Sequence, residues 1–535
     1  MHFPVPHRLS RLSLLVTLSL VLAPVMGTAA RSEATAFTQS LAATAASDAA
    51  IAEWYRTTAF ETLWTGPEDA ERRAALLAAI ATAKDHGLPV PRYDARALTA
   101  ALQTARTEGD RGRVEVEMTR AYLAWAQDLG AGALEPQKID AGIVREITRT
   151  EPEVLLARIA TGDPKAVLDG LLPDSRQYMQ LMKAKLGLEA QIAAGGWGAV
   201  VPAASLAPGD TGPAVIALRD RLVRMGYLSP TAVASYDRAL QAAVTAFQLN
   251  HGLIADGVAG EGTVAEINIG PEGRLKSVIV AMERERWLDF DREVKQIWVN
   301  LPDFRARIIE DGKTVFETRV VIGKNVPDQR SPEFSDEMDH MVINPSWGVP
   351  RSIIIKEYLP LLQRNPNAVS HIQVIDGRGR VVPRGSVNFA AYSARSFPYG
   401  MRQPPSDGNA LGKVKFMFPN VHNIYLHDTP SKSLFDNEVR AYSHGCIRVA
   451  DPFALAHELL SWQTDNAEAE FDAALVTGKE TTVRLKEHLP VHLVYFTAYP
   501  DAKGRITYRR DVYGRDAVLW GALAEAGVEL AGVQG

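Results

Sequence analysis

The chain has one cysteine, and it lies in the stretch Ala441-Tyr442-Ser443-His444-Gly445-Cys446-Ile447-Arg448-Val449. Upstream, the apolar run at residues 424–426 predicts a short strand that delivers His427 to a loop. Downstream, Asp451 and Pro452 are typical of the N-cap and first turn of a helix. We therefore expect Cys446 on a loop just before a helix, a place where functional groups are often presented.

A cysteine in this setting can act as a nucleophile if a neighbouring group removes its proton. The ordinary thiol pKa is about 8.5, so an imidazole is the usual activator. His427 would take the proton and later return it to a leaving amine, and Asp428 would orient the ring through its side chain or its carbonyl. His444 is a second candidate, although it could point elsewhere.

The neighbours of Cys446 suggest how a reacting group would be held. The consecutive N–H groups of Gly445 and Cys446 could bind an oxyanion, supported by Ser443 and His444. Arg448 could hold a substrate carboxylate in a fork of donors, or it could merely satisfy a helix end.

Two other interpretations of the cysteine stay open. A lone cysteine is often a small buried hydrophobe. A zinc site built from His427, His444 and Cys446 would have three protein ligands and one open position. Neither His-Glu-x-x-His nor paired Cys-x-x-Cys occurs in the chain, so we expect no metal and no cofactor.

The spacing of His427 and the Ser443-His444-Gly445-Cys446 run resembles the signature of the L,D-transpeptidase (YkuD-type) catalytic domain. In that family the upstream histidine is the base and the cysteine the nucleophile. Residues 425–430 (YLHDTP) and 342–350 (VINPSWGVP) resemble the large Gram-negative branch. Some members have asparagine in place of Arg448 and some large ones lack a histidine at position 444, which favours His427 as the base. The resemblance implies substrate contacts from Arg448, Tyr425, Tyr442 and Trp347.

The composition of the chain and its N-terminal residues indicate which class of protein it belongs to. It has 46% hydrophobic and 23% charged residues and a net charge of −5, typical of a globular protein without affinity for nucleic acid. Basic residues, an apolar run at 12–25 and small residues up to 30 predict a secretory signal peptide at 1–30, although an uncleaved anchor stays open. A single cysteine in an oxidising compartment can form no internal disulfide, which strengthens the nucleophile interpretation.

The pattern then predicts four further parts. Residues 34–200 read as an alanine-rich helical scaffold, with helices at 70–84 and 118–129. After the Gly- and Pro-rich boundary, residues 206–268 read as three helices starting near Val215, Asp237 and Thr263. This unit resembles the peptidoglycan-binding domain in the segments Leu218–Leu222, Gly226–Leu228, Ala246–Gln248, His251–Leu253 and Asp256–Val258. A small helical spacer is the alternative.

Past Pro271 the pattern becomes alternating, and residues 275–500 read as a mostly β catalytic domain. Strands are expected at 297–301, 304–309, 315–322, 341–344, 414–418, 482–485 and 491–497. Residues 350–412, of helical and loop character, read as an insertion that acts as a lid or as a surface excursion without a gating role. A strand at 506–510 and a helix at 517–530 form the C-terminal part, 501–535.

The sequence therefore predicts an exported, periplasmic, cell-wall-associated enzyme of multidomain α+β fold. The resemblance implies that Cys446 forms an acyl-enzyme with a peptidoglycan stem peptide, that a second stem resolves it into a 3→3 cross-link, and that carbapenems acylate the same thiol. Alternatives are L,D-carboxypeptidase activity or lipoprotein attachment or release by the same cysteine. Two other classes stay open. A zinc peptidase would lose its activity on chelation. A non-catalytic protein that binds peptidoglycan stems and glycan would show no acylation of Cys446.

Overall fold

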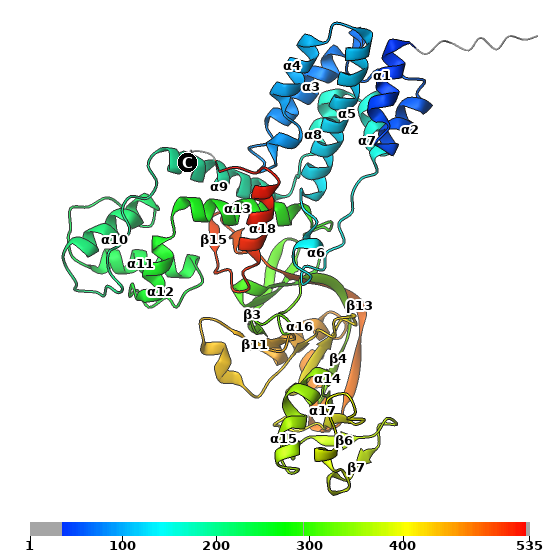
Figure 1. The fold of residues 1–535 in the computed structure, drawn as a ribbon. Helices are drawn as coiled ribbons and strands as arrows, with labels where there is room; N and C mark the ends of the chain where they lie inside the picture. The colour runs from blue at the N-terminus through cyan, green and yellow to red at the C-terminus, as the bar shows by residue number, and fades with distance from the viewer. Residues whose placement is uncertain (1–34, 293, 531–535) are drawn as a thin grey trace, which may run out of the picture.

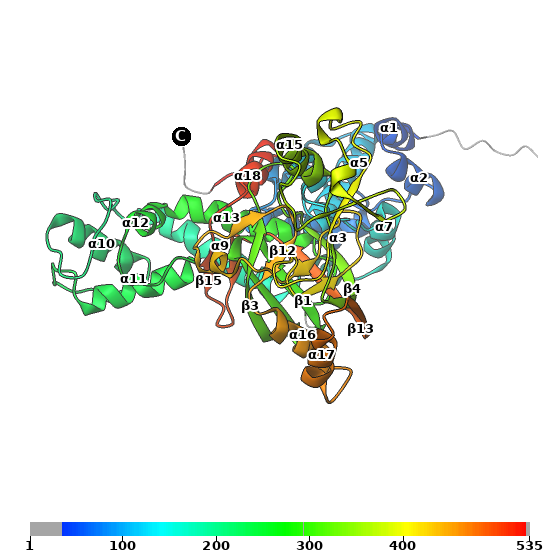
Figure 2. The same cartoon turned by 90° about the horizontal axis from the view of Figure 1, so that it is seen from below.

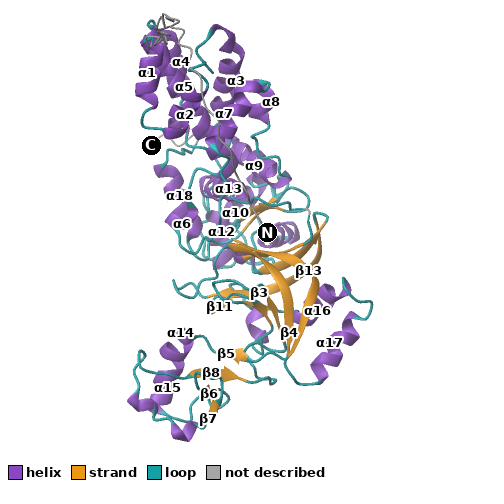
Figure 3. Ribbon diagram, turned by 90° about the vertical axis from the view of Figure 1, so that its right-hand side faces the viewer, coloured by secondary structure: helices purple, strands orange, loops and turns teal. Residues whose placement is uncertain are grey.

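The computed structural model describes residues 35–292 and 294–530 (Figure 1). The expected signal peptide at 1–30 lies outside the described residues. Figures 1 and 3 show an elongated molecule, with the N-terminal helices at one end, a large sheet in the middle and a small insertion at the other end. Within the described residues, no helix is both long and apolar enough to cross a membrane.

The N-terminal part is helical, as the sequence predicts, and packs around its longest helix, α5. A capping box between Thr107 and Asp110 starts α5, and the aromatic side chains of Tyr122 and Trp125 lie on its buried face. The elements are α1 (Ala36–Ala45), α2 (Ala49–Thr57), α3 (Ala70–Ala81), α4 (Ala95–Thr104), α5 (Glu108–Ala131), α6 (Pro136–Ile139), α7 (Pro152–Thr161), α8 (Pro164–Asp169) and α9 (Arg176–Ala193).

A separate three-helix unit follows and projects sideways from the body (Figure 2). It consists of α10 (Pro213–Arg224), α11 (Arg238–Asn250) and α12 (Glu261–Asn268), around a core of its own. Asp237 caps α11 by accepting the Leu240 N–H at 2.9 Å, which confirms the predicted start. The unit touches the rest of the chain where Arg510 pairs with Glu266 at 3.1 Å.

The expectation that the helical pattern ends at Pro271 is wrong. Helix α13 (Pro271–Arg286) continues to Arg286 and is buried along most of its surface. Even Glu283 and Arg286 are buried, and they pair with each other at 3.0 Å. Charged residues thus occur on the buried faces of this helix as well. The sequence therefore lacks the apolar stripe by which an amphipathic helix is recognised.

The middle of the molecule is a sheet of strand order β11-β3-β12-β10-β9-β4-β13-β1-β2, which closes on itself because β2 also pairs with β3. Residues 482–485 and 491–497, expected as two strands, belong mainly to one long strand with an irregularity between Arg484 and Leu489. The strands are β1 (Gln296–Asn300), β2 (Arg305–Glu310), β3 (Lys313–Gly323), β4 (Phe334–Ile343), β9 (Val414–Met417), β10 (Leu426–His427), β11 (Ala441–Ser443), β12 (Ile447–Val449) and β13 (Thr481–Val494).

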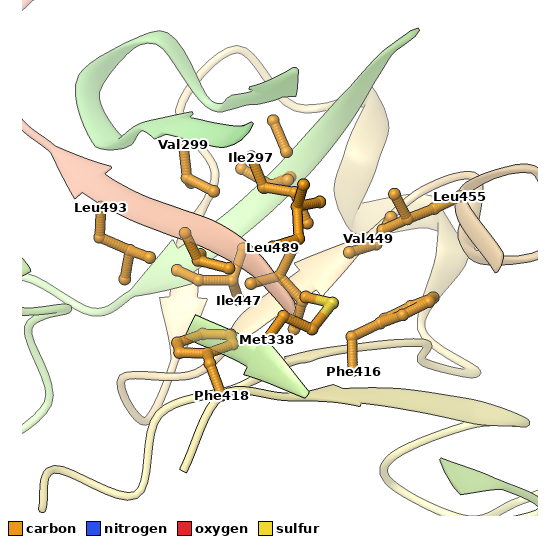
Figure 4. Packing of buried hydrophobic residues seen from close by; sticks show 14 of the residues in the cluster. Ile297, Val299, Met338, Phe416, Phe418, Ile447, Val449, Leu455, Leu489 and Leu493 are labelled. Carbon is orange, nitrogen blue, oxygen red and sulfur yellow. The ribbon is translucent and has the colours of Figure 1, made fainter. Parts of the chain in front are cut away.

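The closed sheet is filled by apolar side chains, and two of these come from the strand next to Cys446. Figure 4 shows Ile447 and Val449 packed with Phe416, Met338 and Leu489. Helices α16 (Pro452–Ser461) and α17 (Ala467–Val476) follow β12. Cys446 therefore precedes a strand rather than a helix, because β12 intervenes before the helix that begins at Pro452.

The insertion is a small unit with its own apolar core. It contains a sheet that the sequence did not predict, because its strands are only two to four residues long. The elements are β5 (Trp347–Gly348), α14 (Arg351–Ile353), a π-helical turn η4 (Ile354–Tyr358), α15 (Leu359–Arg364), β6 (Gln373–Ile375), β7 (Val381–Val382) and β8 (Gly400–Gln403), in sheet order β5-β8-β6-β7.

The C-terminal part returns to the body of the molecule as the hairpin β14 (Ala498–Pro500) and β15 (Ile506–Tyr508), then α18 (Arg515–Glu525). Arg515 is buried and pairs with Glu333 at 3.3 Å, just before β4. Arg284 of α13 pairs with the same carboxylate at 3.5 Å. Helices from two distant parts of the chain are thus tied to the residue that precedes β4, at one end of that strand.

Candidate active site

The register of two parallel strands gathers the predicted site residues. In β10 and β12, Leu426 lies opposite Ile447 and His427 opposite Arg448. Leu426 and Ile447 are fully buried in the sheet interior. Because successive side chains along a strand alternate between its faces, the other face carries the chemically active set. That set is Tyr425, His427, Cys446 and Arg448.

These four side chains line a cleft of about 800 Å³ between the closed sheet and the insertion. The insertion contributes the opposite wall through Trp347, Arg351, Glu357 and Tyr358. The cleft therefore has the size of a ligand site and converging polar groups.

His427 is held in one orientation and one tautomer. Its Nδ1 lies 2.5 Å from the Asp428 carbonyl oxygen, which can only accept, so Nδ1 carries the proton. Nε2 is left as the acceptor. Burial, with Arg448 nearby, lowers the pKa of His427 from 6.5 to about 3. The ring is therefore neutral at neutral pH and competent as a base.

The Cys446 thiol is also neutral at rest. Its burial against the cleft raises the pKa of the thiol to about 11, although Tyr425 and Arg448 act in the opposite direction. The Sγ donates to the Asn423 carbonyl at 3.5 Å. Thiol and imidazole thus face the same cleft as an uncharged pair, and a thiolate would form only with a group that stabilises it.

The turn that presents Cys446 is held by hydrogen bonds from both sides. Ser443 Oγ donates to the Cys446 carbonyl at 2.5 Å and accepts the Gly445 N–H at 3.1 Å. Gly445 has φ of +118°, a value that a side chain would strain. Since the Gly445 N–H is already satisfied, an oxyanion would have to displace Ser443 from it. Ser331 Oγ donates to the Gly445 carbonyl at 2.6 Å from behind.

His444 lines the same cleft as Cys446 but is paired with a residue of the insertion. Its Nε2 lies 2.6 Å from Glu357 Oε1 of the insertion. The Asp428 carboxylate is also engaged elsewhere: it accepts the Lys413 N–H at 2.8 Å and pairs with Lys432 at 2.7 Å. The ring of His427 is therefore oriented by the Asp428 carbonyl, one of the two alternatives that the sequence left open.

Three of the four predicted substrate contacts line the cleft. The Arg448 Nε is buried and has no hydrogen-bond partner among the described residues. The Tyr425 phenol interacts with the side chains of Cys446 and Trp347. Tyr442 is instead 37% exposed, does not line the cleft, and its hydroxyl accepts from Asn437 at 3.2 Å.

Sequence reasoning missed the partners that the fold brings from a distance. Glu357 and Asn423 belong to no motif, and nothing in the sequence places either of them beside the residues 443–446. Within residues 35–292 and 294–530, no three potential metal ligands gather in one place, and the His444 Nε2 is engaged by Glu357.

Family models match three segments of the chain. Residues 294–483 match the YkuD L,D-transpeptidase catalytic domain, residues 49–184 match the Scaffold domain, and residues 211–267 match the "Putative peptidoglycan binding domain". The catalytic match includes both Cys446 and His427.

One relative with a similar sequence points in the same direction as the family models. A protein of Haemophilus influenzae named "Putative L,D-transpeptidase" is 34% identical over 222 residues, covering 41% of this chain and 44% of that protein. The match thus spans less than half of this relative. The solved L,D-transpeptidase of Xylanimonas cellulosilytica is 16% identical, with 54% of this chain and 98% of that chain covered, at a TM-score of 0.16, too low to indicate a shared overall fold. By its family matches, the chain carries a YkuD-type L,D-transpeptidase catalytic domain together with a domain of the peptidoglycan-binding family.

Proposed function

We propose that this protein is an exported L,D-transpeptidase that forms 3→3 cross-links between peptidoglycan stem peptides through a Cys446 acyl-enzyme. The observation that carries the proposal is the register of β10 and β12, which sets His427, Cys446 and Arg448 on one face of the sheet in a single cleft. The family matches at residues 294–483 and 211–267 support a substrate in the cell wall.

The donor step begins from the neutral pair. Cys446 Sγ attacks the carbonyl that joins the third residue of a tetrapeptide stem to its terminal D-alanine. The thiol proton passes to His427 Nε2 as the S–C bond forms. When the C–N bond breaks, His427 returns that proton to the amine of the departing D-alanine. Transfer during attack suits a thiol with a pKa near 11 and an imidazole with a pKa near 3, because both resist charge until substrate arrives.

Arg448 and Tyr425 have complementary roles in this step. The Arg448 side chain lines the cleft, and its Nε has no hydrogen-bond partner among the described residues, so the guanidinium can donate to a donor-stem carboxylate. The Tyr425 phenol lies against the thiol and can donate to sulfur as charge develops. The acyl-enzyme is then resolved by the amine of a second stem, which forms the new amide and restores the thiol.

The rest of the chain suits this role. The unit at 206–268 would hold the enzyme on its polymeric substrate, and the leader at 1–30 would export it to the periplasm. The insertion would cover the bound stem as a lid. Carbapenems, as strained acyl donors, would acylate the same sulfur.

Intact-mass measurement tests the proposal directly. The full-length protein incubated with a tetrapeptide stem should gain the mass of the tripeptide acyl group, and with a carbapenem the mass of the drug. Cys446→Ala should gain neither, because removal of a covalent nucleophile abolishes the intermediate. Product analysis of the unmutated protein distinguishes cross-linking from hydrolysis. Mass gain that persists in Cys446→Ala would refute the thiol mechanism.

A further inference from the structure

A second cavity, of about 730 Å³, opens beside the catalytic cleft, and we call it the side groove. Four segments form its walls: residues 144–148 before α7, residues 287–290 after α13, residues 334–336 at the start of β4, and residues 419–422 between β9 and β10. His422 lines both the side groove and the cleft. The two cavities therefore meet at one side chain.

The meeting point is close to the nucleophile. Asn423, which follows His422, is the residue whose carbonyl accepts the Cys446 thiol at 3.5 Å. Consecutive Cα atoms are about 3.8 Å apart, so the side groove begins roughly one residue from the contact with sulfur. The His422 ring packs against Phe334 with centroids 5.2 Å apart, at the junction of the two cavities. A long side chain lying in the groove could reach the thioester.

The groove is acidic. Its lining includes Glu146, Asp289 and Asp336, and none of these carboxylates is in an ion pair with any residue that the structure describes. Arg145 is the one Lys or Arg side chain in the lining, and it is turned inward, where it donates to the Leu493 carbonyl at 2.6 Å and to Ser335. Anionic groups therefore dominate the open surface of the groove.

We propose that the side groove binds the acceptor stem peptide and guides the cationic amine of its diamino acid to the acyl-enzyme. This assignment rests on the proposed function and adds to it the place from which the second substrate arrives. The carboxylates would attract the ammonium group by charge complementarity. The donor stem, whose terminus is a carboxylate, is instead served by Arg448 in the cleft.

The chemistry balances as follows. The acceptor ammonium gives one proton to solvent as it leaves the groove for the cleft. Its nitrogen attacks the thioester, the N–C bond forms, and the C–S bond breaks. The remaining extra proton on nitrogen passes through His427 to the Cys446 thiolate. The products are the cross-link and the original thiol.

A pair of double variants tests the assignment. Glu146→Gln/Asp289→Asn removes two charges from the groove, and both side chains are exposed, so folding should be preserved. Asp472→Asn/Glu525→Gln removes two exposed charges that line neither cavity, as the matched control. Both pairs are combined with Cys446→Ala, so that equilibrium binding is measured without turnover.

The probe is a stem tripeptide with a free diamino-acid amine, titrated calorimetrically at low salt. Exposed charge pairs are individually weak, so we expect the groove variant to raise the Kd about three- to tenfold. The control should leave the Kd unchanged. High salt should weaken binding to the protein with the intact groove and have little effect on the groove variant.

Two results would overturn the assignment. One is an equal Kd for the groove and control variants. The other is equal affinity for a tripeptide whose side-chain amine is acetylated, which would indicate that the groove recognises a neutral part of the wall polymer. Released D-alanine, measured with the active protein, reports on the proposed function separately. Its absence would refute that function, while charge-dependent tripeptide binding would still support the groove.

Discussion

Tyr513→Phe should show how strongly the C-terminal part of the chain holds the nucleophile turn. The Tyr513 hydroxyl donates to the Gly323 carbonyl at 2.7 Å and accepts the Ser331 N–H at 3.2 Å. Ser331 in turn donates to the Gly445 carbonyl at 2.6 Å, next to Cys446. Phenylalanine would keep the stacking of the ring at position 513 on Tyr495 and remove only the hydroxyl.

The magnitude follows from the groups left behind. The substitution leaves one buried carbonyl and one buried N–H without a partner, and Ser331 is fully buried. Each such group costs about 1–3 kcal/mol, so we expect the free energy of unfolding of the catalytic domain to fall by about 2–6 kcal/mol. The loss should lower the denaturant midpoint without changing the slope of the transition.

Urea unfolding followed by near-UV circular dichroism measures this change. Tyr93→Phe is the matched control, because the Tyr93 hydroxyl is buried but has no hydrogen-bond partner among the described residues. Its removal should be neutral or stabilising. Equal midpoints for the Tyr513→Phe and Tyr93→Phe proteins would show that the hydroxyl of Tyr513 does not hold the turn.

Four further predictions concern the site and the peptidoglycan-binding unit. His427→Ala should slow acylation by about 10²–10⁴, whereas His444→Ala should do less because its ring faces Glu357; mass-resolved kinetics that reverse this order would exchange their roles. Cys446 alkylation by iodoacetamide should rise steeply between pH 9 and about 11, and a plateau already reached by pH 7 would contradict a raised thiol pKa. Because the pKa of His427 is lowered, its neutral ring should contribute stability that is present above pH 6.5 and is lost as the pH falls toward 3. The urea midpoint should therefore fall over this pH range, and it should fall less in His427→Gln. A midpoint that does not change with pH, or that falls equally in both proteins, would contradict the lowered pKa. Deleting 206–268 should weaken sedimentation with purified sacculi but leave turnover of soluble stems nearly intact, and unchanged sedimentation would argue against a tethering role.

The sequence predicted those parts of the fold in which local pattern and burial agree. The three-helix unit, the hairpin of β2 and β3 and most other strands of the closed sheet follow from periodicity and turn residues. Helix α13 did not follow from periodicity. Its charged residues Glu283 and Arg286 look like surface residues in the sequence, but they are buried in the protein, where they pair with each other. The short strands of the insertion were missed because two residues cannot display an alternation.

The candidate site divides in the same way. Cys446 and His427 could be selected from the sequence because the motif spacing is local and specific. The pairing of His444 with Glu357 joins residues far apart in the chain, and no local pattern encodes it. The mismatch at Tyr442 has a simple origin: it lies two residues before His444, but the irregular pairing of β11 with β3 directs it to Asn437 outside the cleft.

The way the insertion joins the closed sheet has a consequence for how such an enzyme can be altered. Its first and last strands are antiparallel partners, with Trp347 opposite Gln403 and Gly348 opposite Arg402, so the chain leaves and re-enters the body through adjacent points. Its interior is its own. A short β-turn that joins residue 348 to residue 402 could therefore replace the unit without interrupting a strand of the closed sheet. A unit of different length could be inserted between the same two residues. Substrate range could thus diversify by exchanging this piece while the strands that carry the nucleophile and the base remain as they are.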